Sequence, residues 1–137
     1  MNALTKPFVC AILMTALAGT PGLTAAGPYD GSRPFLCAVT AILECAATSG
    51  QCEPHIADDA TAPAIIKFDV AGQTVTTGAA RKSPLKSVTH VDGQLILQGS
   101  EDGLGWSATI DEETGRMAVA IVDNDYTFSL FGACTIP

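Results

Sequence analysis

The side chains that could do chemistry in this chain are two histidines, several carboxylates and scattered serines. A nucleophile and its base would have to come from His55, His90, Ser107 and Ser129. However, the sequence contains no Gly-x-Ser-x-Gly elbow, His-Glu-x-x-His motif, phosphate-binding loop or dinucleotide fingerprint. Nothing in the spacing places a serine, a histidine and an aspartate together. The sequence therefore predicts a protein that is not an enzyme, with no catalytic residue and no cofactor.

Metal binding is the second chemistry to consider. The turns Asp111–Glu113 and Asp123–Asp125 carry the oxygen ligands that hard cations prefer. Neither follows a defined calcium loop, and such residues are common in tight turns. A Cys/Cys/His zinc site using His55 or His90 would call for paired Cys-x-x-Cys, which is absent. We therefore predict no metal site, and we interpret His90, just before the Asp92-Gly93 turn, as a partly buried structural histidine.

Disulfide formation is the chemistry that the cysteines favour. Four of the five cysteines lie downstream of the N-terminal apolar run, and an even number in a small exported domain indicates disulfides. Four cysteines allow three pairings. The turn at Thr48–Gly50 places Cys45 opposite Cys52, whereas a Cys37–Cys45 bond would need the segment between them to fold back on itself. We predict the pairs Cys45–Cys52 and Cys37–Cys134, the second joining the first strand to the last.

The N-terminus has the pattern of a secretory signal peptide. Lys6 precedes an apolar run from Phe8 to Ala18, and small residues follow at Thr24-Ala25-Ala26. A transmembrane helix needs about 20 apolar residues, so this run predicts no membrane span. We predict a signal peptide over residues 1–26, cleaved near Ala26, and a periplasmic or secreted protein that loses Cys10 with the peptide.

Charge excludes one class of partner. Without Lys6 the chain has six basic and 14 acidic residues, a net charge of −8. Nucleic-acid binding usually needs a clustered basic surface, so we expect no nucleic-acid partner. Arg81, Lys82 and Lys86 form the one basic group, which we interpret as a solvated loop, with contact to a small anion as the alternative.

Alternating apolar and polar residues from Gly93 to Cys134 predict the strands that position these side chains. The turn signals are Asp92-Gly93, a polar run that ends at Gly115, and Asp123–Asp125. Together they predict a meander of four strands. Its inward set is Leu95, Leu97, Trp106, Ile110, Met117, Val119, Ile121, Phe128 and Leu130.

The upstream half is less regular. Phe35–Ala46 has apolar residues at both odd and even positions, a pattern that fits a strand or a helix. The turn before Cys52 favours a hairpin. Ile65–Val70 and Thr74–Thr77 alternate as short strands. We expect connections or loops over residues 53–63, 78–84 and 99–105.

About eight strands without a helical pattern predict an all-β domain over residues 35–137, after a flexible leader over residues 27–34. A bond between the first and last strands favours an antiparallel up-and-down barrel stapled by disulfides. A two-sheet β-sandwich is the alternative.

Barrels of this size are either filled by side chains or hold one small ligand. The candidate contact residues for a ligand or partner are Trp106, Tyr126 and Phe128, and Trp106 fits equally a plug at one end of the core. The function hypothesis is a non-catalytic binding module for a small apolar ligand, held in an internal cavity of a few hundred Å³, or for an envelope protein at the rim. The alternative is an inhibitor of an envelope hydrolase such as a lysozyme or protease, acting through residues 78–84 or 99–105.

Five short motifs also resemble a group of small exported bacterial proteins without a characterised function. They are Phe35–Cys37, Glu44-Cys45, Gly105–Ser107, Thr114–Met117 and Phe131–Thr135. The motifs are structural, so the resemblance implies an exported β domain and transfers no functional residue. The expected architecture is also loosely similar to periplasmic lysozyme and protease inhibitors.

Overall fold

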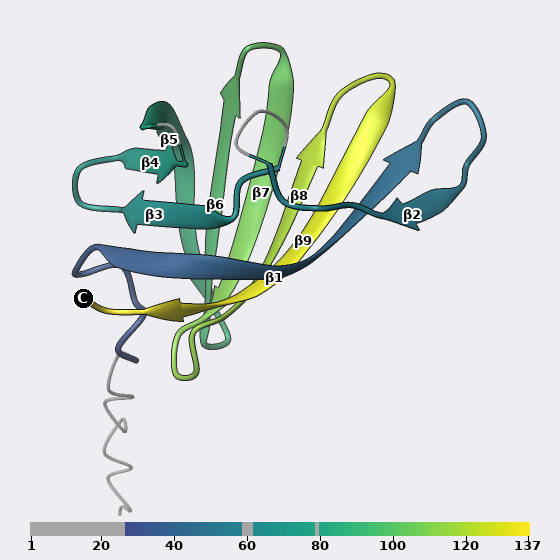
Figure 1. Cartoon of the computed structure of the whole chain (residues 1–137). Helices are drawn as coiled ribbons and strands as arrows, with labels where there is room; N and C mark the ends of the chain where they lie inside the picture. Colours follow the sequence, from purple (N-terminus) through teal and green to yellow (C-terminus); the bar gives the residue numbers. More distant parts are fainter. Residues whose placement is uncertain (1–26, 59–61, 79) are drawn as a thin grey trace, which may run out of the picture.

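The computed structural model describes residues 27–58, 62–78 and 80–137, which fold into one closed antiparallel β-barrel of eight strands with one extra strand (Figure 1). The predicted signal peptide, residues 1–26, lies outside the described residues. The strands are β1 (Phe35–Ala46), β2 (Cys52–Pro54), β3 (Ile65–Asp69), β4 (Thr74–Thr77), β5 (Arg81–Val91), β6 (Gln94–Glu101), β7 (Leu104–Asp111), β8 (Arg116–Val122) and β9 (Tyr126–Thr135). The up-and-down barrel is therefore confirmed over the β-sandwich alternative.

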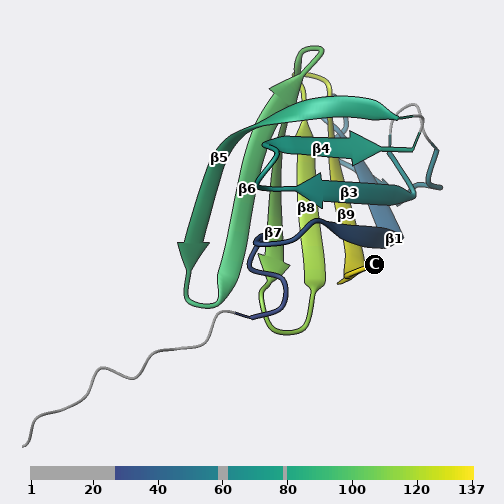
Figure 2. The same ribbon diagram turned by 90° about the vertical axis from the view of Figure 1, so that its left-hand side faces the viewer.

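Strand β1 closes the barrel because it pairs on both edges. It pairs with β9 from Leu36 to Ala46, while its first four residues pair with β3 and residues 43–45 pair with the extra strand β2. Figure 2 shows β3, β4 and the first part of β5 crossing over the wall formed by β6–β9. A closed sheet leaves no long free edge of backbone donors and acceptors, which limits association through strand edges.

The ambiguous segment from Phe35 to Ala46 is a strand, and its mixed parity has a structural cause. The register with β9 shifts between Val39 and Ala41, as in a β-bulge. Phe35 is therefore buried before the shift, but Ile42 is the buried residue after it, at 5% exposure. In an unbroken strand every second residue would point inward, but in β1 the inward positions change from odd to even residue numbers at this shift.

Tight turns shape the end of the barrel that carries the β5–β6 and β7–β8 connections. Asp92 and Gly93 have φ values of 49° and 75°, the left-handed pair that a two-residue hairpin requires. Gly115, at 72°, ends the β7–β8 turn. Both turns occur where the sequence predicts them.

Two segments expected as loops are largely strand. β6 extends to Glu101 and β7 begins at Leu104, so only Asp102 and Gly103 form the turn between them. β5 begins at Arg81, which places the basic residues of that region on a strand. The alternation in β5 is hidden because its first inward side chain is Ser83, which is 6% exposed although polar. The glycine, serine and charged residues of these segments therefore lie mostly at the ends of strands and not in long loops.

The core lies inside the barrel, on the inner face of the closed sheet. Six residues of the predicted inward set are buried, and the other three, Trp106, Ile121 and Phe128, are partly buried against the core. Phe35 of β1 and Phe68 of β3 add an aromatic pair with ring centroids 5.4 Å apart. Complete burial of one large apolar side chain stabilises a fold by about 1.5–3 kcal/mol, so this cluster is the main source of stability. The buried apolar residues are Phe35, Cys37, Ile42, Ala62, Ile66, Phe68, Val75, Leu85, Leu95, Leu97, Ala108, Ile110, Met117, Val119 and Leu130.

Both predicted disulfides are confirmed. Cys37 of β1 is bonded to Cys134 of β9, and Cys45 of β1 is bonded to Cys52 of β2. In each pair the two residues stand directly opposite each other in the antiparallel register. Two disulfides indicate an oxidising compartment outside the cytoplasm.

The segment before β1 contacts the barrel through Tyr29, although the sequence predicts a flexible leader over residues 27–34. The Tyr29 hydroxyl donates a 3.0 Å hydrogen bond to the carbonyl oxygen of Cys134, and its backbone N–H donates to Glu112. Its ring meets the ring of Phe35 edge to face, with centroids 6.1 Å apart.

Within the described residues, no helix is both long and apolar enough to cross a membrane.

Candidate functional site

A small apolar pocket lies inside the barrel at the end that carries the β6–β7 turn. Its volume is about 80 Å³. We call it the mouth pocket. Thr77, Arg81, Ser83 and Glu101 line it beside the apolar residues and supply its polar and charged part. The apolar lining consists of Pro63, Ile66, Phe68, Val75, Leu104, Trp106, Val119 and Ile121.

Trp106 forms a fixed wall of this pocket. Its partner across the β6–β7 ladder is Gly99, and the indole fills the space over that glycine: a Cβ at Gly99 would lie 2.6 Å from the ring atom Cε2. The indole Nε1–H donates a 3.0 Å hydrogen bond to Ser83 Oγ. The one polar atom of the ring is thus satisfied, which leaves its apolar surface as wall. In β-sheets, an aromatic ring on one strand can pack over a glycine of the neighbouring strand and fill the space that the glycine leaves empty.

The pocket is smaller than the sequence hypothesis requires. A ligand-binding barrel is expected to hold an internal cavity of a few hundred Å³, whereas the mouth pocket has about 80 Å³. An apolar cavity of about 150 Å³ is enough to bind benzene. The mouth pocket therefore fits a group smaller than a benzene ring, such as a branched aliphatic side chain. Larger hollows in the described residues are open depressions of the outer surface.

The three predicted contact residues are only partly brought together. Trp106 lines the mouth pocket, and Ile121 lies between it and Phe128 in one inward row across β7, β8 and β9. Phe128 does not line the pocket; it packs against His55, with ring centroids 5.6 Å apart. Tyr126 is 44% exposed on β9. The mouth pocket thus contains one of the three residues.

A histidine between two carboxylates is a feature that sequence reasoning misses. His55 Nδ1 lies 3.0 Å from Glu44 Oε2, and Nε2 lies 3.1 Å from Asp58 Oδ2. Only an imidazole that carries both protons can donate to both oxygens. Glu44 and His55 meet because the β1–β2 hairpin folds one over the other, and no spacing rule signals it. Through these two contacts, His55 links the segment after β2 to Glu44 of β1.

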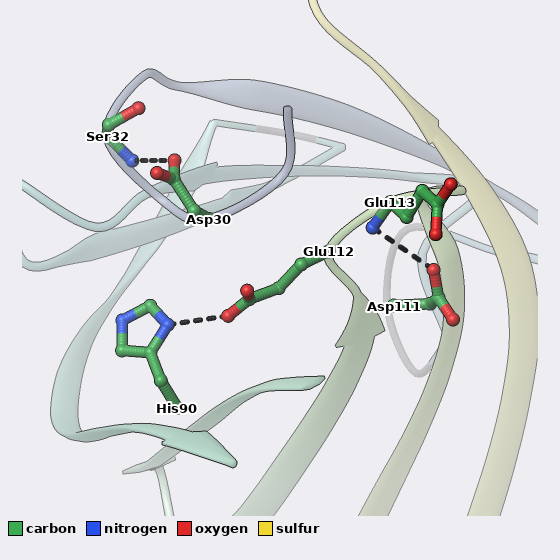
Figure 3. A network of polar contacts seen from close by, with 6 residues as sticks. All are labelled: Asp30, Ser32, His90, Asp111, Glu112 and Glu113. Carbon is green, nitrogen blue, oxygen red and sulfur yellow. Dashed lines mark hydrogen bonds and ion pairs between the residues drawn. The ribbon is translucent and has the colours of Figure 1, made fainter. Parts of the chain in front are cut away.

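The second histidine, His90, lies at the end of the barrel opposite the mouth pocket, next to the β5–β6 turn. His90 Nδ1 is 2.6 Å from Glu112 Oε1, and the His90 side chain is 52% exposed (Figure 3). The interpretation of His90 as partly buried is therefore wrong, because β5 ends beyond the core at this point. Hydrogen bonds from Ser32, followed by the charge of His90, lower the pKa of Asp30.

Asp111, at the same end, organises the β7–β8 turn. Its Oδ1 accepts hydrogen bonds from the Thr114 N–H at 2.7 Å, the Thr114 hydroxyl at 2.8 Å and the Glu113 N–H at 3.2 Å. These bonds, those from Thr114 first, lower the pKa of Asp111. Its role is that of a turn cap. Across the described ranges, no group of three or more histidine, cysteine or acidic side chains is arranged to hold a metal ion.

In comparisons with known proteins, no family model matches the chain, and no curated protein matches it.

Proposed function

We propose that this protein is a periplasmic or secreted, non-catalytic binding module that holds one small branched aliphatic group in the mouth pocket. The observation that carries the proposal is the pocket itself, an apolar recess inside the barrel with Trp106 as a fixed wall. A concave apolar site with a few polar groups at its edge is the usual form of a small-molecule or side-chain binding site.

The residues that line the pocket limit the kind of ligand group that it can hold. Ser83 is the polar side chain deepest in the pocket region, at 6% exposure, and it already accepts the indole N–H. A polar ligand group inserted there could replace its hydrogen bonds to water only through the Ser83 hydroxyl proton and the Thr77 hydroxyl, and an incompletely satisfied buried polar group is unfavourable. Arg81 and Glu101 line the same pocket. The ligand is thus apolar where it enters, with any polar part at Arg81 and Glu101.

The inhibitor hypothesis gains no support from a specific feature. Its contact loops would be residues 78–84 and 99–105, and the structure has strand in most of both segments. A short two-residue turn offers little surface for insertion into a hydrolase cleft. We therefore carry the binding-module proposal forward alone.

Trp106 is the single tryptophan of the chain, so binding can be read directly from its fluorescence and from its indole N–H signal in NMR. The probe is N-acetyl-leucinamide, with N-acetyl-glycinamide as the size control. We expect saturable changes at Trp106 with the leucine amide, with a dissociation constant of about 1 mM or weaker because so few atoms are buried, and none with the glycine amide.

A pair of neighbouring variants separates pocket binding from surface binding. Ile121→Phe adds volume to the wall of the pocket, whereas Val122→Phe changes the next residue of β8, whose side chain is 43% exposed on the outer surface. We expect the first variant to lose the response and the second to keep it. An unsaturable response in the native protein, or unchanged binding in a folded Ile121→Phe protein, would contradict the proposal.

A further inference from the structure

A second hollow lies at the barrel end opposite the mouth pocket, and a residue of the N-terminal segment forms part of its wall. Its volume is about 510 Å³, and we call it the acidic hollow. Gly27 is the first residue that the structure describes, and it lines the hollow together with the β5–β6 and β7–β8 turns. The remaining lining residues are Asp92, Gly93, Gln94, Asp111, Glu112 and Glu113.

Gly27 is held in this position by backbone contacts. Two residues later, the Tyr29 N–H donates a 3.0 Å hydrogen bond to the carbonyl oxygen of Glu112, and the Asp30 N–H donates to the Gly27 carbonyl at 3.3 Å. The Cα of Gly27 packs so closely on the Glu112–Glu113 peptide that a Cβ would collide with the Glu112 carbonyl oxygen and lie 3.0 Å from the Glu113 nitrogen. The site therefore requires glycine.

The charges around Gly27 are unbalanced. Of the four acidic residues in the hollow, Asp111 is engaged in its turn and Glu112 binds His90. The carboxylates of Asp92 and Glu113 make no hydrogen bond or ion pair with the described part of the chain. An acidic cluster alone would argue for no ligand. Here a residue of the same chain, Gly27, already lines the hollow.

We propose that Gly27 is the first residue of the mature protein and that its α-ammonium group binds in the acidic hollow. The proposal rests on the predicted signal peptide and does not depend on the mouth pocket. Hydrolysis adds water across the Ala26–Gly27 amide: Ala26 leaves with the new carboxylate, and the Gly27 amine takes up a proton. The neutral amide nitrogen of a residue that lines the acidic hollow is thereby replaced by a cation, so that processing adds a positive charge at this end of the barrel.

The pH dependence follows from the groups that face Gly27. These are Asp92 from the β5–β6 turn, Asp111, Glu112 and Glu113 from β7 and its turn, Gln94 from β6, His90 beyond Glu112, and Asp30 from the same segment. An α-amino group ordinarily has a pKa of about 7.7–8.0. Nearby carboxylates favour the protonated amine and raise that pKa in the folded state. The stabilisation is therefore complete below about pH 7.7 and is lost as pH rises through the raised value.

The first experiment is intact mass and N-terminal sequencing of the exported protein, which we expect to begin at Gly27. The second compares thermal unfolding of two full domains, one beginning at Gly27 and one that retains Ala25-Ala26. We expect the Gly27 form to unfold about 1–5 °C higher at pH 7 in low salt. We expect this difference to shrink above pH 9 and in 1 M salt.

A direct readout does not depend on stability. The rate at which the amine of Gly27 reacts with an acylating reagent, followed against pH, gives its pKa in the folded protein. We expect that pKa to fall when Asp92→Asn and Glu113→Gln are combined, and to stay unchanged in Glu53→Gln, an exposed carboxylate on β2. A mature chain that begins elsewhere, or an amine whose pKa is unaffected by the double substitution, would overturn the proposal. Either result leaves the mouth-pocket test untouched.

Discussion

The indole of Trp106 occupies the space that a side chain at Gly99 would fill, and the two residues face each other across the β6–β7 ladder. The absence of a side chain on one strand is thus matched by the largest side chain on its neighbour. The hydrogen bond from the indole to Ser83 carries the contact on to β5. Three strands are therefore joined at the wall of the mouth pocket by one side chain.

Substitution Gly99→Ala is expected to destabilise the protein by about 1–3 kcal/mol, because the new methyl group would displace Trp106 or press on the Pro84 carbonyl oxygen 2.7 Å away. Urea unfolding measures the loss, and the emission maximum of Trp106 reports whether the ring moves toward water. Gly105→Ala is the matched control, since its Cβ would lie 3.6 Å from Val122, an ordinary contact. Equal stability of the two variants would contradict the packing described for Trp106.

The two disulfides are expected to contribute unequally to stability. Residues Cys37 and Cys134 are 97 positions apart, whereas Cys45 and Cys52 are 7 apart. The loop-entropy model gives about 5 kcal/mol for the first bond and about 2 kcal/mol for the second. Paired Cys→Ala variants and chemical unfolding test this order. A larger loss from the Cys45/Cys52 pair would show that local strain or packing outweighs loop entropy.

The anchoring of the N-terminal segment can be tested at Tyr29. Tyr29→Phe removes the hydrogen bond to the Cys134 carbonyl oxygen but keeps the ring, so we expect a loss of about 0.5–1.5 kcal/mol in the free energy of unfolding. Tyr126→Phe is the control, because that side chain is 44% exposed on β9. Hydrogen exchange at residues 27–34 should also speed up in Tyr29→Phe alone. Unchanged exchange would mean that backbone contacts suffice to hold the segment.

Acid sensitivity should depend on Asp111. Hydrogen bonds to its carboxylate lower its pKa in the folded state, so the stability it contributes is present above the unfolded pKa of about 3.9 and is lost as pH falls through the lowered value. Asp111→Asn should therefore be less stable than the native protein at pH 7, with the difference vanishing toward pH 2. Thermal unfolding across pH 2–7 measures this. A difference that stayed constant down to pH 2 would contradict this role of Asp111.

Much of the barrel is predictable because local rules and global structure agree in its second half. Asp92-Gly93 supplies the turn, and the alternation of β7 and β8 identifies the buried face, as Ile110 and Met117 show. The disulfide pairing is also predicted correctly, because the turn before Cys52 favours Cys45–Cys52 and leaves Cys37 to pair with Cys134. In these segments the residue types alone indicate which side chains are buried and where the turns lie.

Elsewhere the determining contacts are distant in sequence. The bulge in β1 exchanges the buried face so that Ile42 points inward, and it depends on pairing with β9, about 90 residues away. The start of β5 is concealed because its inward residue is Ser83, whose burial depends on Trp106. The volume of the mouth pocket and the meeting of His55 with Glu44 depend on strand placement in three dimensions. No local pattern encodes them.

The bond between Cys37 and Cys134 also has a consequence for chain cleavage. Because it joins residues near the two ends of the described chain, the segment between them forms a covalent ring. A protease that cut one exposed turn, such as Asp102-Gly103, would open that ring without releasing a fragment. The two new ends would remain held by neighbouring strands and by the same covalent link. After a single cut the molecule would thus remain in one piece, provided that its disulfide stays oxidised.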